Sequence, residues 1–207
     1  INFIIEFLIN IIICPIIARS LKIGVPLIEE TDTYKLALAT VNIPDKIAKT
    51  NKETSFTQND LVSCDTALFC CFIIRAFCLS SATSRDKAIE FSNDYINNIK
   101  KILNKKFNSL VSVLSDMFDN RTSFYDRIFV SKNDTERKFR AILEEFEYII
   151  KTDIISNEYT PFSETSPLPI LGIDVDMKIR MEVMKLYNDL PNLVAPYFEN
   201  ITNQLKK

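Results

Sequence analysis

The sequence predicts an all-α protein, organised as one domain over residues 1–207 and built as a bundle of about seven or eight helices. Of its 207 residues, 47% are apolar and 25% are charged, a composition that supports a folded core without metal or disulfides. Apolar residues recur at spacings of three and four along most of the chain. Only two glycines are present, and strand-like pieces such as 169–173 are short. These observations favour helices over a sheet.

The first element, residues 1–18, is almost entirely apolar and carries Asn2, Glu6 and Asn10 at intervals of four. On a helix this spacing makes one narrow polar stripe, which predicts an apolar N-terminal helix buried on most sides. Pro15 is expected to kink or end this helix. The length and composition of the segment also suit a membrane anchor, which stays open as the alternative.

A second helix is expected to begin at Pro26, which suits the first helical position, and to end near residues 42–44. Residues 45–56 are polar and lysine-rich, which predicts a connecting loop or a short helix. Residues 57–60 form a variant of the capping box. They are predicted to open a strongly apolar helix that continues to about residue 82.

The clearest pattern predicts one long helix over about residues 85–118. Its apolar stripe comprises Ile96, Ile99, Leu103, Phe107, Leu110, Leu114 and Met117. A shorter helix is expected around 124–130. After Asn133 and Asp134 the same spacing returns, and it predicts a further helix with the stripe Phe139, Ile142, Leu143, Phe146, Ile149 and Ile150.

The C-terminal quarter begins with a segment that prolines keep out of a helix. Residues 155–172 contain Pro161, Pro167 and Pro169, and they are predicted to form a long loop or a flap. Two closing helices are expected, over about 174–189 and 191–206. The stripe of the second of these helices comprises Leu193, Tyr197, Ile201 and Leu205.

The residue types that are missing exclude several chemistries. The chain has no histidine, which removes Ser-His-Asp and Cys-His catalytic arrangements, HExxH zinc proteases and haem held by a proximal histidine. Gly24 and Gly172 lie too far apart to form a phosphate-binding glycine loop. Acid or base chemistry would have to use Asp, Glu, Lys, Tyr or Cys. The sequence offers no assembled catalytic set, and we expect no cofactor.

Charge and cysteine content bear on partners and location. The net charge of −2 and a pI near 5.4 disfavour a surface built to neutralise phosphates, so no nucleic-acid partner is expected. The concentrated basic surface of the chain is predicted to be a solvated helix face, and it comprises Lys100, Lys101, Lys105 and Lys106. Five cysteines are an odd number spread over a long chain, which favours a reducing, cytoplasmic location. A membrane-associated location is the alternative.

Cys64, Cys71 and Cys78 lie at intervals of seven and share one face of the third predicted helix. Seven residues rise about 10.5 Å, too far for three thiolates around a single zinc ion. We therefore expect these thiols to be reduced, buried and central in the core. Arg75 lies in the same apolar helix, and we expect it to pair with a carboxylate.

Two pairs of carboxylates could bind a divalent cation. Asp116 and Asp119 lie one helical turn apart, as do Glu144 and Glu147, so each pair could chelate Mg²⁺ from one helix face. The pattern resembles that of the all-α nucleoside triphosphate pyrophosphatases, which is ExxE followed later by ExxD. Here the first pair is Asp/Asp and the second is Glu/Glu. The resemblance implies a Mg²⁺-dependent hydrolase of a phosphorylated small molecule.

Three of the four methionines, Met177, Met181 and Met184, share one stripe of a C-terminal helix. Methionine fills ordinary cores, which is the interpretation that we favour, and it also suits adaptable contact surfaces. If the protein works through contacts between chains, the C-terminal helices are the expected source of an apolar patch. The leading hypothesis is a non-enzymatic protein-interaction or self-association module, with a protein partner or a homo-oligomer. The alternatives are the Mg²⁺-dependent hydrolase and a protein anchored in a membrane by residues 1–18.

Overall fold

The structure is a computed structural model that describes residues 31–130, 135–159, 161 and 176–207. The described residues form eight α-helices and no strand, which confirms the predicted all-α bundle. The helices are α3 (Asp32–Val41), α4 (Ile43–Thr50), α5 (Asp60–Ser80), α6 (Arg85–Lys106), α7 (Val111–Val130), α8 (Thr135–Ser156), α9 (Met177–Leu193) and α10 (Ala195–Lys206). Two short 3-10 helices, η2 (Ser55–Thr57) and η3 (Asn108–Leu110), lie between them.

The chain divides into two units, residues 1–31 and 32–207, and the eight described helices all belong to the second unit. The predicted helix over 1–18 and the predicted helix start at Pro26 lie outside the described residues. The second predicted helix is seen as α3, which ends at Val41 close to its expected end. That one domain covers the whole chain stays a prediction.

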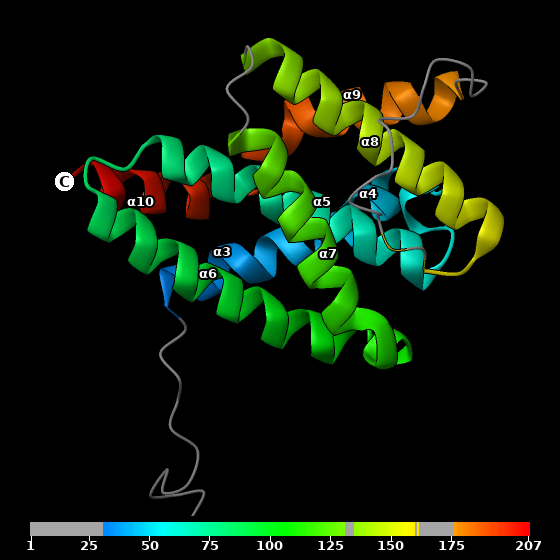
Figure 1. Cartoon of the computed structure of the whole chain (residues 1–207), viewed down its shortest axis with the longest axis horizontal. Coiled ribbons are helices and arrows are strands. Elements are labelled where there is room, and N and C mark those ends of the chain that lie inside the picture. Colours follow the sequence, from blue (N-terminus) through cyan, green and yellow to red (C-terminus); the bar gives the residue numbers. More distant parts are fainter. Residues whose placement is uncertain (1–30, 131–134, 160, 162–175) are drawn as a thin grey trace, which may run out of the picture. The chain divides into compact units, whose positions relative to one another are not determined.

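Helix α5 is the centre of the 32–207 unit, as Figure 1 shows. It contacts each of the other seven helices described above, and most of its side chains are buried. The helix begins at Asp60, because the side chain of Asn59 accepts a hydrogen bond from the Val62 backbone N–H at 2.8 Å. The predicted cap at Thr57 is therefore displaced by two residues, since Thr57 ends the short helix η2 instead.

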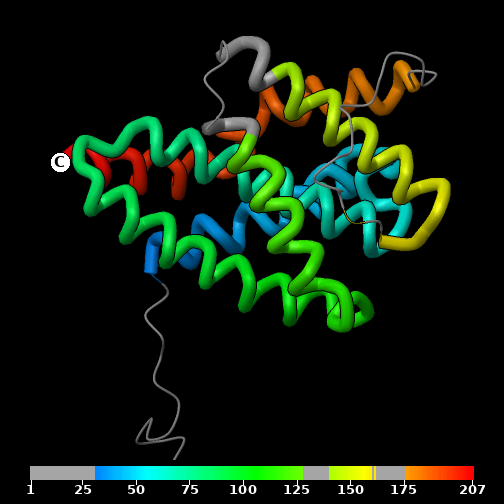
Figure 2. The backbone as a smooth tube through the Cα atoms, in the orientation of Figure 1, coloured from blue at the N-terminus to red at the C-terminus, as the bar shows by residue number. Residues whose placement is uncertain are grey.

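The prediction of one long helix over 85–118 is wrong. The chain leaves the helix at Phe107 (φ −106°, ψ 56°) and passes through η3. Figure 2 shows the green tube turning sharply between α6 and α7. The apolar spacing continues across this corner, so the pattern gave no sign of it. Two features of the packed structure explain the turn. The Phe107 side chain is buried in the core, and the Lys106 ammonium donates a hydrogen bond to the Val41 carbonyl at 3.1 Å.

The corner brings α7 back against α5 and α8. Leu114 and Met117 thereby reach the core, where a straight continuation of α6 would have carried them away from it. The separate helix expected at 124–130 is the end of α7. The helix expected after Asn133 and Asp134 is confirmed as α8.

The C-terminal helices differ from prediction at their ends. Helix α8 continues through Ser156, so the first two residues of the predicted 155–172 loop are helical, and most of that loop lies outside the described residues. Asn157 then adopts a positive φ of 51°, as residues that follow a helix often do. Helix α9 includes Pro191 and ends at Leu193, beyond the predicted end at 189. The break comes at Val194, whose side chain is buried.

Candidate functional site

The structure does not gather the four carboxylates proposed to bind Mg²⁺. Three of them have a basic partner of their own: Asp119 lies 3.1 Å from Lys100, Glu144 lies 2.8 Å from Arg140, and Glu147 lies 3.1 Å from Arg180. Asp116 is exposed on α7. Among the described residues there is no group of three or more His, Cys, Asp or Glu side chains that could hold a metal ion. The described geometry therefore gives the hydrolase hypothesis no metal centre.

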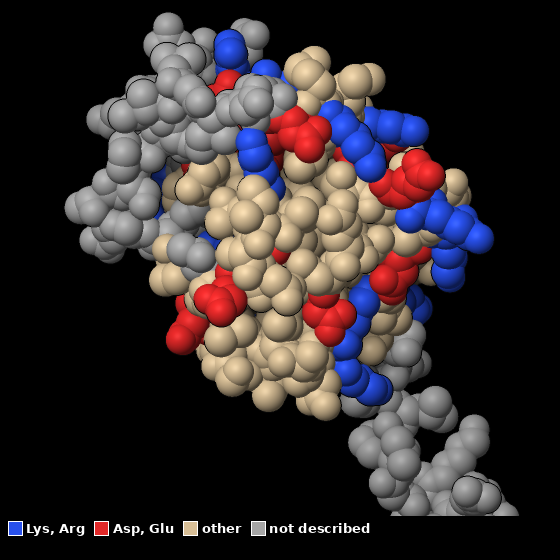
Figure 3. Space-filling model, turned by 90° about the vertical axis from the view of Figure 1, so that its right-hand side faces the viewer, with Lys and Arg blue, Asp and Glu red and all other residues tan. Residues whose placement is uncertain are grey.

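The predicted lysine face is divided between solvent and structural contacts. Lys101 and Lys105 are exposed, as expected for a solvated helix face. Lys100 lies over the Phe118 ring, 4.6 Å from its centroid. Lys106 reaches across to Asp45 at 2.8 Å and holds the corner described above. Half of this face therefore fixes α6 to its neighbours. Figure 3 shows one face of the molecule, on which basic and acidic side chains lie next to each other and form no broad basic area.

The cysteine prediction is confirmed for the four cysteines that the structure describes. Cys64, Cys70, Cys71 and Cys78 are all free and buried in α5. Burial away from water raises the pKa of each thiol, and it raises that of Cys78 to about 12. These thiols are protonated at neutral pH and fill the core, as small apolar side chains do.

The prediction for Arg75 is also confirmed. Its guanidinium donates to Asp126 of α7 at 3.0 Å and to the Ser92 hydroxyl of α6 at 2.9 Å. Arg75 and Arg121 also line a small cleft between α5, α6 and α7. The free volume of this cleft, about 20 Å³, is on the scale of a single water molecule, so it offers no room for a substrate.

Sequence reasoning missed a buried ionic cluster, which lies between α5, α7 and α8. Arg121 of α7 donates to both carboxylate oxygens of Asp65 on α5, at 2.9 and 3.0 Å, and both side chains are almost fully buried. Burial acts to lower the pKa of Arg121, but the charge and hydrogen bonds of Asp65 outweigh it and raise that pKa. The sequence did offer a signal for this cluster, because Asp65 is a charged residue in the apolar stretch of α5 and therefore needs a partner. The same reasoning predicted a partner for Arg75.

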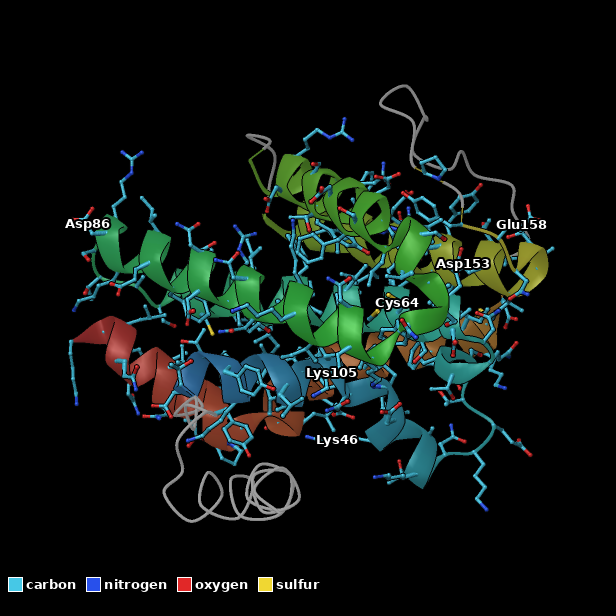
Figure 4. All side chains as sticks on the ribbon, turned by 90° about the horizontal axis from the view of Figure 1, so that it is seen from below. Lys46, Cys64, Asp86, Lys105, Asp153 and Glu158 are labelled. Atoms are coloured by element: carbon cyan, nitrogen blue, oxygen red, sulfur yellow. The ribbon has the colours of Figure 1, made fainter. Side chains whose placement is uncertain are left out.

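Helix α8 adds two more buried carboxyls to this cluster, Glu145 and Asp153, with exposures of 4% and 1%. Burial raises the pKa of Glu145 to about 7, against a smaller lowering by Arg121. Burial, together with the neighbouring Asp65, raises the pKa of Asp153 by more than burial raises that of Glu145. Figure 4 labels Asp153 on α8 and Cys64 on α5, the residue before Asp65. The Arg121 guanidinium also lies over the Tyr159 ring, with 5.3 Å between the guanidinium carbon and the ring centroid.

The surface of α9 carries a second feature, which we call the methionine face: Met177, Met181 and Met184. These side chains are 62%, 67% and 48% exposed, so the expectation that they fill the core is wrong. The opposite side of α9 is the one that packs inward, and its buried residues are Ile179, Val183, Leu186 and Leu190. Four apolar residues already cover the inward face, so the methionines are left to solvent.

The C-terminal stripe expected on α10 divides in the same way. Ile201 and Leu205 are buried, Leu193 is half-buried and packs against the core, and Tyr197 is 39% exposed. This stripe therefore serves mainly to attach α10 to the bundle. The other exposed large apolar residues, Ile89, Val111 and Ile155, lie on three different helices, and single exposed residues of this kind are common on soluble proteins.

Within the described part of the chain, α5 is the one helix whose length and composition would allow it to cross a membrane. Of its most apolar stretch, 83% is buried inside the bundle, as in the core helix of a water-soluble protein, so this is weak support for a membrane protein. Comparison with protein-family models, with curated proteins and with solved structures gives no match. The methionine face and the buried ionic cluster are the two features that support a functional interpretation here.

Proposed function

We propose that the protein is an interaction module that binds an amphipathic helix of a partner protein on the methionine face of α9. The observation that carries this proposal is the exposure of Met177, Met181 and Met184, at 62%, 67% and 48%, in one row along a helix. Methionine is flexible and polarisable, and it is favoured at surfaces that adapt to apolar partners. Three such residues at intervals of four and three make a continuous apolar ridge.

The charges beside the ridge indicate the chemistry of the partner. By helical spacing, Lys178 and Lys185 flank one side of the methionine face and Arg180 flanks the other. Arg180 pairs with Glu147, and Lys178 donates to the Glu53 carbonyl, but both remain at the border of the face. An apolar ridge between basic flanks is complementary to a helix with an apolar stripe and acidic flanks.

The same flanks disfavour a second copy of the chain as the occupant. Two methionine faces brought together would place Lys178, Arg180 and Lys185 of both copies along one seam, and like charges across an interface are destabilising. Glu182 does not relieve this repulsion, because its carboxylate already accepts the Ser55 N–H at 2.9 Å. Three side chains on one helix also offer less than the ~800 Å² per partner of a standard interface, so we expect a transient contact.

Methionine-methyl NMR of the full chain tests the proposal directly, because the chain has only four methionines. The probe is a synthetic helical peptide with leucines at i, i+4 and i+7 and glutamates on both flanks. The three methyls of the face should shift and saturate with this peptide, and added salt should weaken the effect. Met117, which is completely buried, is the internal control and should not respond. A peptide with lysines in place of the glutamates should bind more weakly.

A pair of triple variants separates the face from general surface apolarity. Met177→Ser, Met181→Ser and Met184→Ser together should abolish binding of the glutamate peptide and leave the urea midpoint nearly unchanged, since the methionines are exposed. The matched control replaces Ile89, Val111 and Ile155 by serine, three exposed apolar residues on other helices, and should bind as the parent does.

Three results contradict the proposal. The first is the absence of any response of the three methyls to the glutamate peptide at millimolar concentration. The second is a shift that depends on protein concentration alone, which makes a second copy the occupant. The third is a response to anionic lipid vesicles that exceeds the response to the peptide, which makes a membrane surface the occupant.

A further inference from the structure

We propose that the buried cluster of Asp65, Arg121, Glu145 and Asp153 is a proton-binding site, and that it links the packing of α8 against α5 and α7 to pH. The inference does not depend on the methionine face. Three observations support it: the number of charges in the cluster, a buried carboxyl oxygen without a hydrogen-bond partner, and the set of groups around the cluster.

The first observation is an excess of carboxyls in the interior. Three carboxyls, from Asp65, Glu145 and Asp153, share one guanidinium, and all four side chains are at most 4% exposed. Arg121 is committed to Asp65 by two hydrogen bonds, so it balances one negative charge. Ionised Glu145 and Asp153 would then be buried negative charges without a full counter-charge, and such groups bind protons instead.

The second observation is an unsatisfied atom. Oδ2 of Asp153 is buried and has no hydrogen-bond partner among the described residues, and the same holds for the hydroxyl oxygen of Tyr159. A buried carboxylate oxygen without a donor is costly, whereas a protonated carboxyl carries its own donor and no charge. The backbone on this side is also held, because the Asn59 side chain donates to the Asp153 carbonyl at 3.2 Å. The site is therefore held in place, and the Asp65 side chain beside Asp153 can hydrogen-bond it only when a proton lies between the two carboxyls.

The third observation is the character of the surrounding groups. The titratable groups around the cluster are Cys64, Cys70 and Asp65 from α5, Asp116, Arg121 and Tyr125 from α7, and Tyr159 after α8. From α9, the charged contact to α8 is Arg180, and it is committed to Glu147. Arg121 is thus the cation that acts on Glu145 and Asp153 in the described structure. The remaining groups are acidic or neutral, so the surroundings favour bound protons.

The direction of the pH effect follows from these groups. The pKa of Glu145 is raised from 4.5 to about 7 and that of Asp153 is raised above its ordinary range, in both cases chiefly by burial. Between the ordinary and the raised values the folded protein holds protons that the unfolded chain has released. Stability is therefore fully present at acidic pH and is lost as pH rises through the raised values. For each proton that the folded protein binds in excess of the unfolded chain, the equilibrium constant of unfolding should increase about tenfold per pH unit.

Urea unfolding of the full chain between pH 6 and pH 8 tests the inference. The range stops at pH 8 because the buried thiols, whose pKa values are raised in the folded state, also ionise on unfolding above it. The unfolding constant of the parent should rise by more than tenfold over this range, most steeply near pH 6 where both carboxyls contribute. Asp153→Asn and Glu145→Gln should each remove about one proton from the slope at pH 6.

The matched control is Glu144→Gln, which changes the neighbouring residue on α8. Its carboxylate side chain is 47% exposed and pairs with Arg140, so the variant should keep the parent's pH slope. Infrared spectroscopy is a second readout, and its main result comes from the parent protein alone. Infrared spectra of the native parent at pH 7 should show the stretching band of a protonated carboxyl in the protein interior, and Asp153→Asn should reduce it.

The outcomes are distinct. A slope that falls in Asp153→Asn and Glu145→Gln but not in Glu144→Gln, together with the carboxyl band, supports the proton site. A parent whose unfolding constant does not change between pH 6 and pH 8 overturns it, as do variants that run parallel to the parent. If Asp153→Asn fails to fold, the slope of Glu145→Gln and the infrared band of the parent still decide.

Discussion

Arg121 on α7 and Asp65 on α5 form a bidentate salt bridge in the protein interior. Nε of Arg121 donates to Oδ1 of Asp65 at 2.9 Å, and Nη2 donates to Oδ2 at 3.0 Å. The exposures of the two side chains are 2% and 1%. Of the described ion pairs it is the only one in which both side chains are buried. Parallel double contacts of this kind fix the relative position of two helices as well as neutralising their charges.

Removing one member of this pair should be strongly destabilising. Arg121→Met leaves the Asp65 carboxylate buried without its cation, so it should lower the free energy of unfolding by about 3–5 kcal/mol. Asp65→Leu should cost less than Arg121→Met, because Glu145 or Asp153 can release its proton and become the counter-charge of Arg121. The double variant should lose less than the two single variants added together, because no isolated charge remains. Urea unfolding at pH 6 measures all three. Additive losses would show that the two residues do not act as a pair.

The control for the buried pair is the partly exposed pair of Arg75 and Asp126, whose side chains are 17% and 46% exposed. Asp126→Asn should cost no more than about 1 kcal/mol, because solvent screens this contact. A loss as large as that of Arg121→Met would contradict the role that we assign to burial.

The thiols of α5 should resist labelling in the native protein. A Cys14→Ser variant confines the measurement to the four described cysteines, which are all buried and have raised pKa values. Thiol reagent at pH 7.5 should react slowly with the folded protein and fully after addition of denaturant. Rapid reaction of two or more thiols without denaturant would show that α5 is not the closed centre of the bundle.

The corner between α6 and α7 should depend on Lys106. Its ammonium donates to the Val41 carbonyl, to the Asn42 side chain and to Asp45, and its side chain is 20% exposed. Lys106→Met keeps the length of the side chain but removes these hydrogen bonds, and it should cost about 1–3 kcal/mol in urea unfolding. The neighbouring Lys105 is exposed, so Lys105→Met should change stability by less than about 0.5 kcal/mol. Equal effects of the two variants would contradict this account.

Millimolar Mg²⁺ should leave the melting temperature unchanged, because three of the four proposed ligands, Asp119, Glu144 and Glu147, are paired with basic side chains. A ligand that bound the native state at a hundred times its Kd would add about 2.7 kcal/mol, which is easily measured. Differential scanning fluorimetry with and without nucleotides provides the test. A rise that disappears in Glu147→Gln would restore the hydrolase hypothesis.

The helices themselves were predictable because their signals are local. Apolar residues three and four apart share a face, so the stripe that ends in Ile149 and Ile150 identified α8 from neighbouring residues alone. Burial of the cysteines followed from the same kind of pattern, since Cys64, Cys71 and Cys78 lie among apolar residues of one helix. The partner of Arg75 was expected as a class, because a charge in an apolar run needs one, but nothing local indicated Asp126.

The sequence by itself therefore determined the all-α class, the central helix and the exclusion of histidine chemistry. Tertiary structure decided three further points. The turn at Phe107 depends on its burial and on the contact of Lys106 with Val41, 65 positions away. The ion pair joins Asp65 and Arg121, which are 56 positions apart. The exposure of Met177, Met181 and Met184 depends on four other residues of α9 covering the core first. Periodicity marks which residues share a face, but only the packed neighbours decide which face is buried.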